Sequence, residues 1–283
     1  MNIEKVFVAG SGLMGSGIAH AVAFSNKKVI LYDISEQAIE KALKSINKIL
    51  DKQLEKGIIS QDKKDNVLNN IETTRDLLLA SSCNLVIEAI VENIDLKKEL
   101  FSKLDNICSS NVIFASNTSS LPITKLARAT KRTDKFIGMH FFSPVDRMKL
   151  IEIIRGYDTS DETFNIIKDF SLLLGKEVST SKDYPGFITT RLGLVLMNEA
   201  VFCLYEGVGT VEDIDKGMKL GYNHPIGPLA LADAIGLDIC LSILDIMYEE
   251  YKDPKYRACP LLRQMVNAGH LGKKTGKGFY NYQ

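Results

Sequence analysis

The sequence predicts an α/β fold, with a doubly wound, mainly parallel sheet followed by an all-α C-terminal domain. Two observations predict it. Strand-like runs alternate with amphipathic helix patterns from the start of the chain to about residue 180. After Tyr184-Pro185-Gly186 the strand patterns cease and only helix patterns follow. We therefore expect two domains, residues 1–184 and residues 185–283.

The stretch Val6–Ala19 has the order strand, tight turn and helix that a dinucleotide site needs. Gly10 allows the sharp turn, Gly12 lets the backbone approach a pyrophosphate, and Gly15 lets the helix pack on its strand. The helix N–H groups would point at the anion. A glycine-rich turn of no special purpose is the alternative. The residues of this loop expected to contact a cofactor are Gly10, Gly12, Leu13, Met14 and Gly15.

Asp33 weakens that alternative. It ends a second strand-like run, Lys28–Tyr32, about 20 residues past the glycines, where a ribose-binding acid belongs. A carboxylate there accepts hydrogen bonds from a ribose 2′-OH and repels a 2′-phosphate. We therefore interpret residues 1–184 as a Rossmann-type domain that binds NAD in preference to NADP.

Composition excludes several classes of protein. The 283 residues carry 35 basic and 35 acidic side chains, and this balance argues against nucleic acid as a main partner. The first residues lead directly into a strand, and no apolar run approaches the length of a membrane span. The five cysteines are scattered without the spacing of a metal site or disulfide framework. We expect a cytoplasmic protein with reduced thiols, no metal and no membrane partner.

A long helix is predicted after Asp33, with its apolar stripe running to about Lys56, where Gly57 ends it. The residues that follow are strongly charged, and basic side chains gather at Lys52, Lys56, Lys63 and Lys64. A solvated helix-turn-helix is the favoured explanation of this cluster. The alternative is a landing place for an anionic substrate handle, such as a nucleotide phosphate.

Two further strands bring polar residues to one edge of the predicted sheet. The run Leu85–Ile90 is followed by Glu92 and Lys97, which are placed to touch the cofactor, because ligands of such sheets bind beyond the carboxyl ends of the strands. The next strand delivers the amide and hydroxyls of residues 117–120. These residues cap a helix that begins near Pro122, or they present donors to a substrate oxygen. The pattern leaves both possibilities open.

An antiparallel hairpin is predicted from Lys135–Phe142 and Met148–Ile154, joined by a turn at residues 143–147. In such a hairpin His140 and Glu152 face each other. A carboxylate on one ring nitrogen fixes the tautomer and leaves the other nitrogen to exchange a proton with a substrate. A lone histidine in a strand is more often structural. With a dinucleotide site upstream, His140 becomes the candidate general acid/base among four histidines.

Residues 185–283 read as helices, over 187–205, from Thr210, over about 228–251 and over 259–269. The segment 237–248 is apolar on several sides, so we expect it to bury itself against a second copy in a homodimer. The closing segment 272–280 contains Lys274 and reads as a flexible basic tail that returns to the cofactor cleft.

The chain resembles the L-3-hydroxyacyl-CoA dehydrogenase family over essentially all of its length. The motifs that carry this resemblance are the glycine loop at 10–15, Glu88–Asn93, Ala115–Leu121, Gly138–Phe142, Pro185–Phe187, His224–Pro228 and the closing Lys-Thr-Gly-Lys-Gly-Phe-Tyr. Each motif is modest evidence alone. Their occurrence together and in this order is highly specific.

The resemblance implies reversible, NAD-dependent oxidation of an (S)-3-hydroxyacyl-CoA to the 3-oxoacyl-CoA. It makes His140 the general acid/base, Glu152 its orienting carboxylate and Ser119 a donor near the reacting oxygen. It also implies dimerisation through the helical domain and a coenzyme A site near Lys52 and Lys56. The positions it assigns to cofactor binding are Asp33, Glu92, Lys97, Asn117, Ser119, Ser143 and Lys274.

Two positions depart from the commonest family pattern. Ser143 and Thr190 stand where many members have asparagine, so each replaces an amide that donates and accepts by a shorter hydroxyl. These changes put the catalytic role of Thr190 and the acyl-chain preference in doubt. Two alternative functions remain. A dehydrogenase for a free hydroxy acid would not need the basic 52–64 region. A non-catalytic NAD-binding protein would not need His140.

Overall fold

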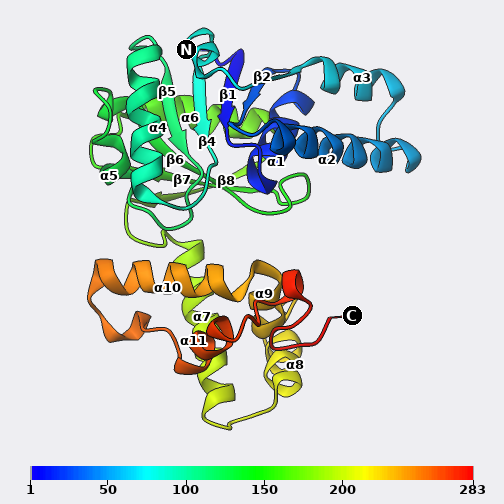
Figure 1. Cartoon of the computed structure of the whole chain (residues 1–283), viewed down its shortest axis with the longest axis vertical. Helices are drawn as coiled ribbons and strands as arrows, with labels where there is room; N and C mark the ends of the chain where they lie inside the picture. The colour runs from blue at the N-terminus through cyan, green and yellow to red at the C-terminus, as the bar shows by residue number, and fades with distance from the viewer. Residues whose placement is uncertain (1, 283) are drawn as a thin grey trace. The chain divides into compact units, whose positions relative to one another are not determined.

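The computed structural model describes residues 2–282, and the chain divides after Tyr184 into two compact units. The first unit contains an eight-stranded sheet in the order β3-β2-β1-β4-β5-β6-β7-β8 (Figure 1). All neighbouring strands are parallel except β6 and β7, which are antiparallel. The strands are β1 (Lys5–Ala9), β2 (Lys28–Tyr32), β3 (Ile71–Thr74), β4 (Leu85–Glu88), β5 (Ile113–Ser116), β6 (Phe136–Phe141), β7 (Leu150–Arg155) and β8 (Glu177–Lys182).

This strand order is that of a doubly wound Rossmann sheet, and the predicted fold class is confirmed. The chain winds outward from β1 through β2 to β3, then returns to β4 on the other side of β1. The order therefore reverses between β1 and β4. Ligands of such sheets bind at this reversal, beyond the carboxyl ends of the strands.

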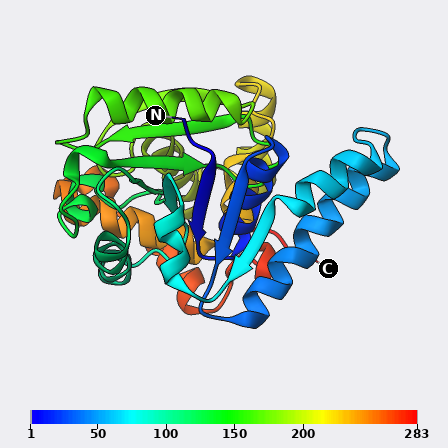
Figure 2. The same cartoon turned by 90° about the horizontal axis from the view of Figure 1, so that it is seen from above.

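Helices cover both faces of the sheet, which explains the continuous apolar runs of β1 and β4. The helices are α1 (Leu13–Phe24), α2 (Glu36–Glu55), α3 (Gln61–Asn69), α4 (Ile94–Ile107), α5 (Ile123–Ala127) and α6 (Asp161–Leu173). One core cluster joins α1, α2, α3 and α6 to one face of the strands. On the other face Phe101 of α4 packs on Phe114 and Phe136, with ring centroids 5.8 and 4.6 Å apart. The α2–α3 pair extends beyond the sheet (Figure 2).

The second unit consists of helices α7 (Thr189–Tyr205), α8 (Val211–Gly221), α9 (Pro228–Ile235), α10 (Leu237–Tyr251) and α11 (Pro260–Asn267). The helix pattern over 228–251 is interrupted at Gly236, whose φ of 110° is a conformation that favours glycine. Leu237, Leu241 and Leu244 of α10 are buried in this unit's own core. The apolar character of α10 is therefore largely satisfied within the unit, which removes much of the sequence argument that this helix is the dimer contact.

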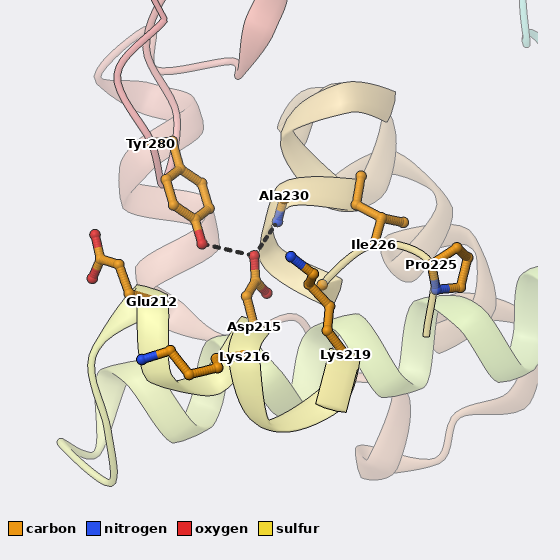
Figure 3. A pocket seen from close by; sticks show the side chains of 9 residues that line it. Glu212, Asp215, Lys216, Lys219, Pro225, Ile226, Ala230 and Tyr280 are labelled. Carbon is orange, nitrogen blue, oxygen red and sulfur yellow. Dashed lines mark hydrogen bonds between the residues drawn. The ribbon is translucent and has the colours of Figure 1, made fainter. Parts of the chain in front are cut away.

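The C-terminal segment differs from the flexible tail expected from the sequence. Buried Asp233 accepts hydrogen bonds from the backbone N–H of Phe279 and Tyr280, both at 2.9 Å. Buried Asp215 accepts the Tyr280 hydroxyl at 2.9 Å and the N–H of Ala230 at 3.0 Å (Figure 3). Burial and the Asp215 carboxylate raise the pKa of Tyr280, so its hydroxyl keeps donating. Two carboxylates thus anchor the segment to the helical unit.

Candidate active site at the carboxyl edge of the sheet

The turn after β1 needs glycine at two positions. Gly10 has a φ of 102°, and a Cβ there would lie 2.6 Å from the carbonyl oxygen of Ala89. A Cβ on Gly15 would lie 1.8 Å from the carbonyl oxygen of Gly10. Helix α1 therefore packs against its own turn at a distance that only a glycine allows.

Gly12 is different, because a Cβ there would meet nothing within 4 Å. It is the N-cap of α1, and no side chain caps this helix or places an acidic group in its first turn. Leu13 and Met14 follow as the first helical residues, with Leu13 73% exposed. The open space and the uncapped helix N-terminus fit a pyrophosphate, which accepts N–H groups and carries the charge that the helix dipole favours.

Asp33 follows β2 and lies across the turn from Ser11. Its Oδ2 accepts the Ser11 backbone N–H at 2.8 Å and the Ser11 hydroxyl at 2.9 Å, and its Oδ1 accepts the Ser35 N–H at 3.0 Å. Because a carboxylate has about four acceptor sites, Oδ1 keeps capacity for a ribose hydroxyl. The same side chain thus stabilises the glycine turn and fits an adenosine ribose.

Glu92 and Lys97, both expected at the cofactor, lie in an ionic cluster below the edge of the sheet. The Lys97 side chain is 1% exposed, and its Nζ lies 2.5 Å from Glu88 and 3.2 Å from Glu92. Burial would lower the pKa of Lys97, but the two carboxylates outweigh it and raise that pKa. The ammonium is therefore held charged within the protein.

Glu92 holds the turn that follows β5. Its Oε1 accepts the hydroxyl of Thr118, the backbone N–H of Ser119 at 3.2 Å and the hydroxyl of Ser120 at 3.1 Å. Burial would raise the pKa of Glu92, and Lys97 together with these hydroxyls lowers it instead. Glu92 is consequently a carboxylate that fixes the shape of residues 118–120.

These contacts exclude one of the two interpretations of residues 117–120, and the other stays a prediction. Helix α5 has no side-chain cap from this segment, and its first N–H groups, from Ile123 and Thr124, donate to Asp183 at 2.8 and 2.7 Å. Asn117 instead accepts the Phe141 N–H at 2.9 Å through its Oδ1 and ties β5 to β6. The helix-cap interpretation is therefore wrong, and the segment presents Ser119 at the edge of the sheet.

His140 lies where these elements meet. In the β6–β7 ladder it is paired with Glu152, and its Nδ1 lies 3.3 Å from Glu152 Oε2. Its Nε2 lies 3.1 Å from the hydroxyl of Ser119. His140 is 5% exposed and Glu152 is fully buried. One ring nitrogen thus faces a carboxylate, and the other faces a hydroxyl, which is the arrangement of an oriented general acid/base.

The basic cluster on α2 and α3 divides into two pairs. Lys63 donates to the Phe24 carbonyl at 2.7 Å, and Lys64 forms a 2.5 Å ion pair with Asp51. Lys52 and Lys56 are exposed, and within residues 2–282 neither forms an ion pair. Two of the four lysines therefore remain available to an anion.

The other expected residues lie apart in the chain. Ser143 is exposed in the loop that joins β6 to β7, next to a cis peptide bond to Pro144. Thr190 and Lys274 belong to the helical unit. Thr190 is buried in the first turn of α7, and Lys274 forms an ion pair with Asp238 at 2.6 Å. Their roles stay predictions.

Fold and site together define an NAD-dependent dehydrogenase: a dinucleotide-binding turn, a ribose-type aspartate and a histidine–carboxylate pair at the carboxyl edge of one sheet. Residues 5–184 match the NAD-binding domain of 3-hydroxyacyl-CoA dehydrogenase, and residues 186–282 match the C-terminal domain of the same family. The chain belongs to the 3-hydroxyacyl-CoA dehydrogenase family, and it is an enzyme whose cofactor is NAD.

Relatives match along the whole chain. A 3-hydroxybutyryl-CoA dehydrogenase of Bradyrhizobium diazoefficiens is 47% identical over 99% of this chain and 96% of its own. The mitochondrial hydroxyacyl-coenzyme A dehydrogenase of Homo sapiens is 42% identical over 99% and 92%. The crystal structure of (S)-3-hydroxybutyryl-CoA dehydrogenase from Ralstonia eutropha superposes with a TM-score of 0.96 at 46% identity, and both chains are covered completely.

Sequence reasoning missed three residues that shape the site, namely Glu88, Ser116 and Asp183. Glu88 and Ser116 were visible as members of neighbouring strands and of two family motifs, but neither was given a role. Their hydroxyl–carboxylate contact, at 2.6 Å, joins residues 28 positions apart. A carboxylate in an otherwise apolar strand was the one available signal, because such a group is rarely buried without a partner.

Proposed function

We propose that this enzyme interconverts (S)-3-hydroxybutyryl-CoA and acetoacetyl-CoA, with NAD as the hydride carrier. The observation that carries the proposal is the position of His140 between the Ser119 hydroxyl and the Glu152 carboxylate. The relatives that are 3-hydroxybutyryl-CoA dehydrogenases match over nearly the full length of this chain, which supports the short acyl chain.

In the proposed mechanism His140 accepts the proton of the substrate hydroxyl and returns it in the reverse reaction. When bound, NAD accepts a hydride from C3 of the substrate. His140 Nε2 takes the proton of the 3-hydroxyl, so that positive charge does not accumulate at C3 while the hydride leaves. Glu152 stabilises the imidazolium that forms and holds Nδ1 protonated. In the reverse direction the imidazolium returns the proton to the oxygen of acetoacetyl-CoA.

Ser119 is proposed to donate to the same substrate oxygen. Its hydroxyl lies 3.1 Å from His140 Nε2, so a substrate oxygen that binds beside the two groups would meet both of them. Its backbone is held by Glu92, which keeps the hydroxyl at a fixed place. A preorganised donor of this kind stabilises the charge that develops on the oxygen.

A dehydrogenase of a free hydroxy acid is the alternative. The exposed pair Lys52 and Lys56 favours the CoA ester, because two ammonium groups at the C-terminal end of α2 suit the phosphates of a nucleotide handle. The test is NAD reduction with (S)-3-hydroxybutyryl-CoA beside free (S)-3-hydroxybutyrate and the (R)-CoA ester. We expect turnover with the (S)-CoA ester alone. Turnover of the free acid at a comparable kcat/KM would contradict the proposal.

We also propose a cytoplasmic homodimer joined through the helical units. A groove of about 460 Å³ between α7 and α8 is lined mostly by apolar side chains, including Leu196, Val208, Ile214 and Met218. Val208 is 72% exposed there, and a second copy would cover it.

Light scattering tests the dimer, with an expected mass of twice 31.4 kDa. Val208→Asp is expected to shift the protein towards monomer. Leu172→Asp serves as control, because Leu172 is equally an exposed apolar residue, 50% exposed, on α6 of the other unit. A wild-type monomer at micromolar concentration would overturn the dimer. The cytoplasmic location is tested by cell fractionation, where activity in the membrane or secreted fraction would contradict it.

A further inference from the structure

We infer that Glu88, a buried carboxylate outside the reacting groups, is a positioning residue that holds Ser119 against His140. It is the last residue of β4, between β1 and β5 in the sheet. Its side chain is completely buried. The inference rests on the proposed roles of Ser119 and His140 and adds a residue that does not touch either of them directly.

Both carboxylate oxygens of Glu88 accept hydrogen bonds. Oε1 accepts the Ile90 N–H at 2.8 Å and the Lys97 ammonium at 2.5 Å. Oε2 accepts the Ser116 hydroxyl at 2.6 Å. Burying a carboxylate is costly unless such partners replace water. Burial raises the pKa of Glu88, and Lys97 and Ser116 oppose this rise. A simple strand residue would not require this set of partners.

Two routes lead from Glu88 to the Ser119 turn. In the first, Lys97 bridges Glu88 and Glu92, and Glu92 accepts the N–H of Ser119 at 3.2 Å. In the second, Ser116 donates to Glu88 and accepts the Thr118 N–H at 3.3 Å. Both routes end in the turn whose hydroxyl lies 3.1 Å from His140 Nε2.

Glu88 and Glu92 share the Lys97 ammonium. It lies 2.5 Å from Glu88 and 3.2 Å from Glu92 Oε2, and Glu92 Oε1 accepts the turn. With a neutral amide at position 88, Glu92 becomes the only carboxylate paired with a buried ammonium. We expect Glu92 to move towards Lys97 and to weaken its hold on Ser119. A displacement of about 1 Å at a reacting group costs about a hundredfold in rate.

The test compares Glu88→Gln with Ser119→Ala and with the double variant. We expect Glu88→Gln to lower kcat for acetoacetyl-CoA reduction by about 10- to 100-fold, with the KM changed by less than about threefold. If Glu88 acts through Ser119, its substitution adds less than about threefold in the Ser119→Ala background. Unchanged kcat in Glu88→Gln, or losses that multiply in the double variant, would overturn the inference.

Glu99→Gln is the matched control. Glu99 forms a 2.6 Å ion pair with Lys103 on the exposed surface of α4, the helix that also carries Lys97. The same chemical change there removes a carboxylate–ammonium pair without touching the Ser119 turn. We expect its kcat and KM to equal those of the wild type.

A second readout needs no turnover. The proton NMR titration of the His140 ring in the cofactor-free protein reports the surroundings of Nε2. We expect Glu88→Gln to shift this resonance and Glu99→Gln to leave it in place. An unshifted His140 resonance in folded Glu88→Gln would overturn the inference about Glu88. A wild type that is inactive with acetoacetyl-CoA would reject the proposed function instead, and the NMR result would still test Glu88.

Ser116→Ala covers the case in which Glu88→Gln fails to fold. It removes one hydroxyl and no charge from the same cluster, and we expect a loss in kcat of about two- to tenfold. This loss should also be non-additive with Ser119→Ala. A Ser116→Ala enzyme with wild-type kcat would contradict the inference.

Discussion

Glu152 lies directly opposite His140 in the β6–β7 ladder, and its Oε2 is 3.3 Å from His140 Nδ1. An antiparallel pair places directly opposite side chains on the same face of the sheet at close range. Two residues 12 positions apart are thereby held as a unit in a buried part of the sheet. The sheet itself, rather than a loop, orients the imidazole.

His140→Gln should remove most turnover and leave cofactor binding intact. The amide neither accepts nor returns a proton at neutral pH, so kcat is expected to fall by about 10²- to 10⁴-fold. The dissociation constant of NADH, measured by its fluorescence, should change by less than about threefold. A kcat within tenfold of the wild type would show that another group moves the proton.

Glu152→Gln should lower kcat less than His140→Gln does. The amide keeps the size of the side chain but loses the charge that stabilises the imidazolium. We expect a loss of about 10- to 100-fold in kcat, because the imidazolium is then less stable. A kcat equal to that of the wild type would contradict the assigned role.

Asp33→Ser should relax the preference for NADH over NADPH. The substitution removes the charge that repels a 2′-phosphate, so the ratio of kcat/KM values for the two cofactors should fall by at least about tenfold. Asp33 also holds Ser11, so NADH binding weakens as well. For that reason the ratio, rather than the NADH value alone, is the informative quantity. An unchanged ratio would exclude Asp33 from ribose recognition.

Lys52→Ala and Lys56→Ala should raise the KM for acetoacetyl-CoA by about two- to tenfold each and leave kcat unchanged. The effect should fade at high salt, because exposed charges are screened. Lys41→Ala is the control, since Lys41 is an exposed lysine on the same helix, about three turns away. Equal KM values in all three variants would show that Lys52 and Lys56 do not contribute to substrate binding.

Acid should destabilise the enzyme through His20. This side chain on α1 is 3% exposed, neither ring nitrogen has a hydrogen-bond partner, and burial lowers its pKa to about 4. Because the unfolded chain binds the proton near pH 6.5 and the folded chain only near pH 4, stability falls as the pH drops through this window. The full loss is about 3 kcal/mol.

Urea unfolding of the wild type and of His20→Leu between pH 7 and pH 4 measures this loss. Leucine does not titrate, so the free energy of unfolding of the variant should depend less on pH over the same range. A wild type and a variant with parallel pH dependences would show that other groups cause the acid sensitivity.

The sequence was sufficient for the features that depend on neighbouring residues. The glycine turn, Asp33 and the alternation that places His140 opposite Glu152 are all readable within short windows. The short strand β3, Ile71–Thr74, was not predicted, since four residues with two threonines and a glutamate lack a clear apolar pattern. Contacts between distant residues were equally out of reach, as with Asp183, which accepts from a helix 60 positions earlier.

The segment 117–120 illustrates the same limit at the site. Its hydroxyls suit a helix cap and a substrate contact equally well, and only the location of Asp183 at the start of α5 excludes the cap. Lys97 is a second case. The contact of Lys97 with the cofactor stays a prediction, whereas its burial between Glu88 and Glu92 was not readable, because it depends on the packing of α4 on the sheet.

The most direct test of the proposed function is the rate of NADH oxidation with acetoacetyl-CoA, followed by absorbance. Two parallel assays replace acetoacetyl-CoA by free acetoacetate and NADH by NADPH. We expect fast turnover with the CoA ester and NADH, and little with either substitute. NADH that binds without being oxidised by acetoacetyl-CoA would contradict the proposed function, and Ser143 and Thr190 would then be the first positions to change to asparagine.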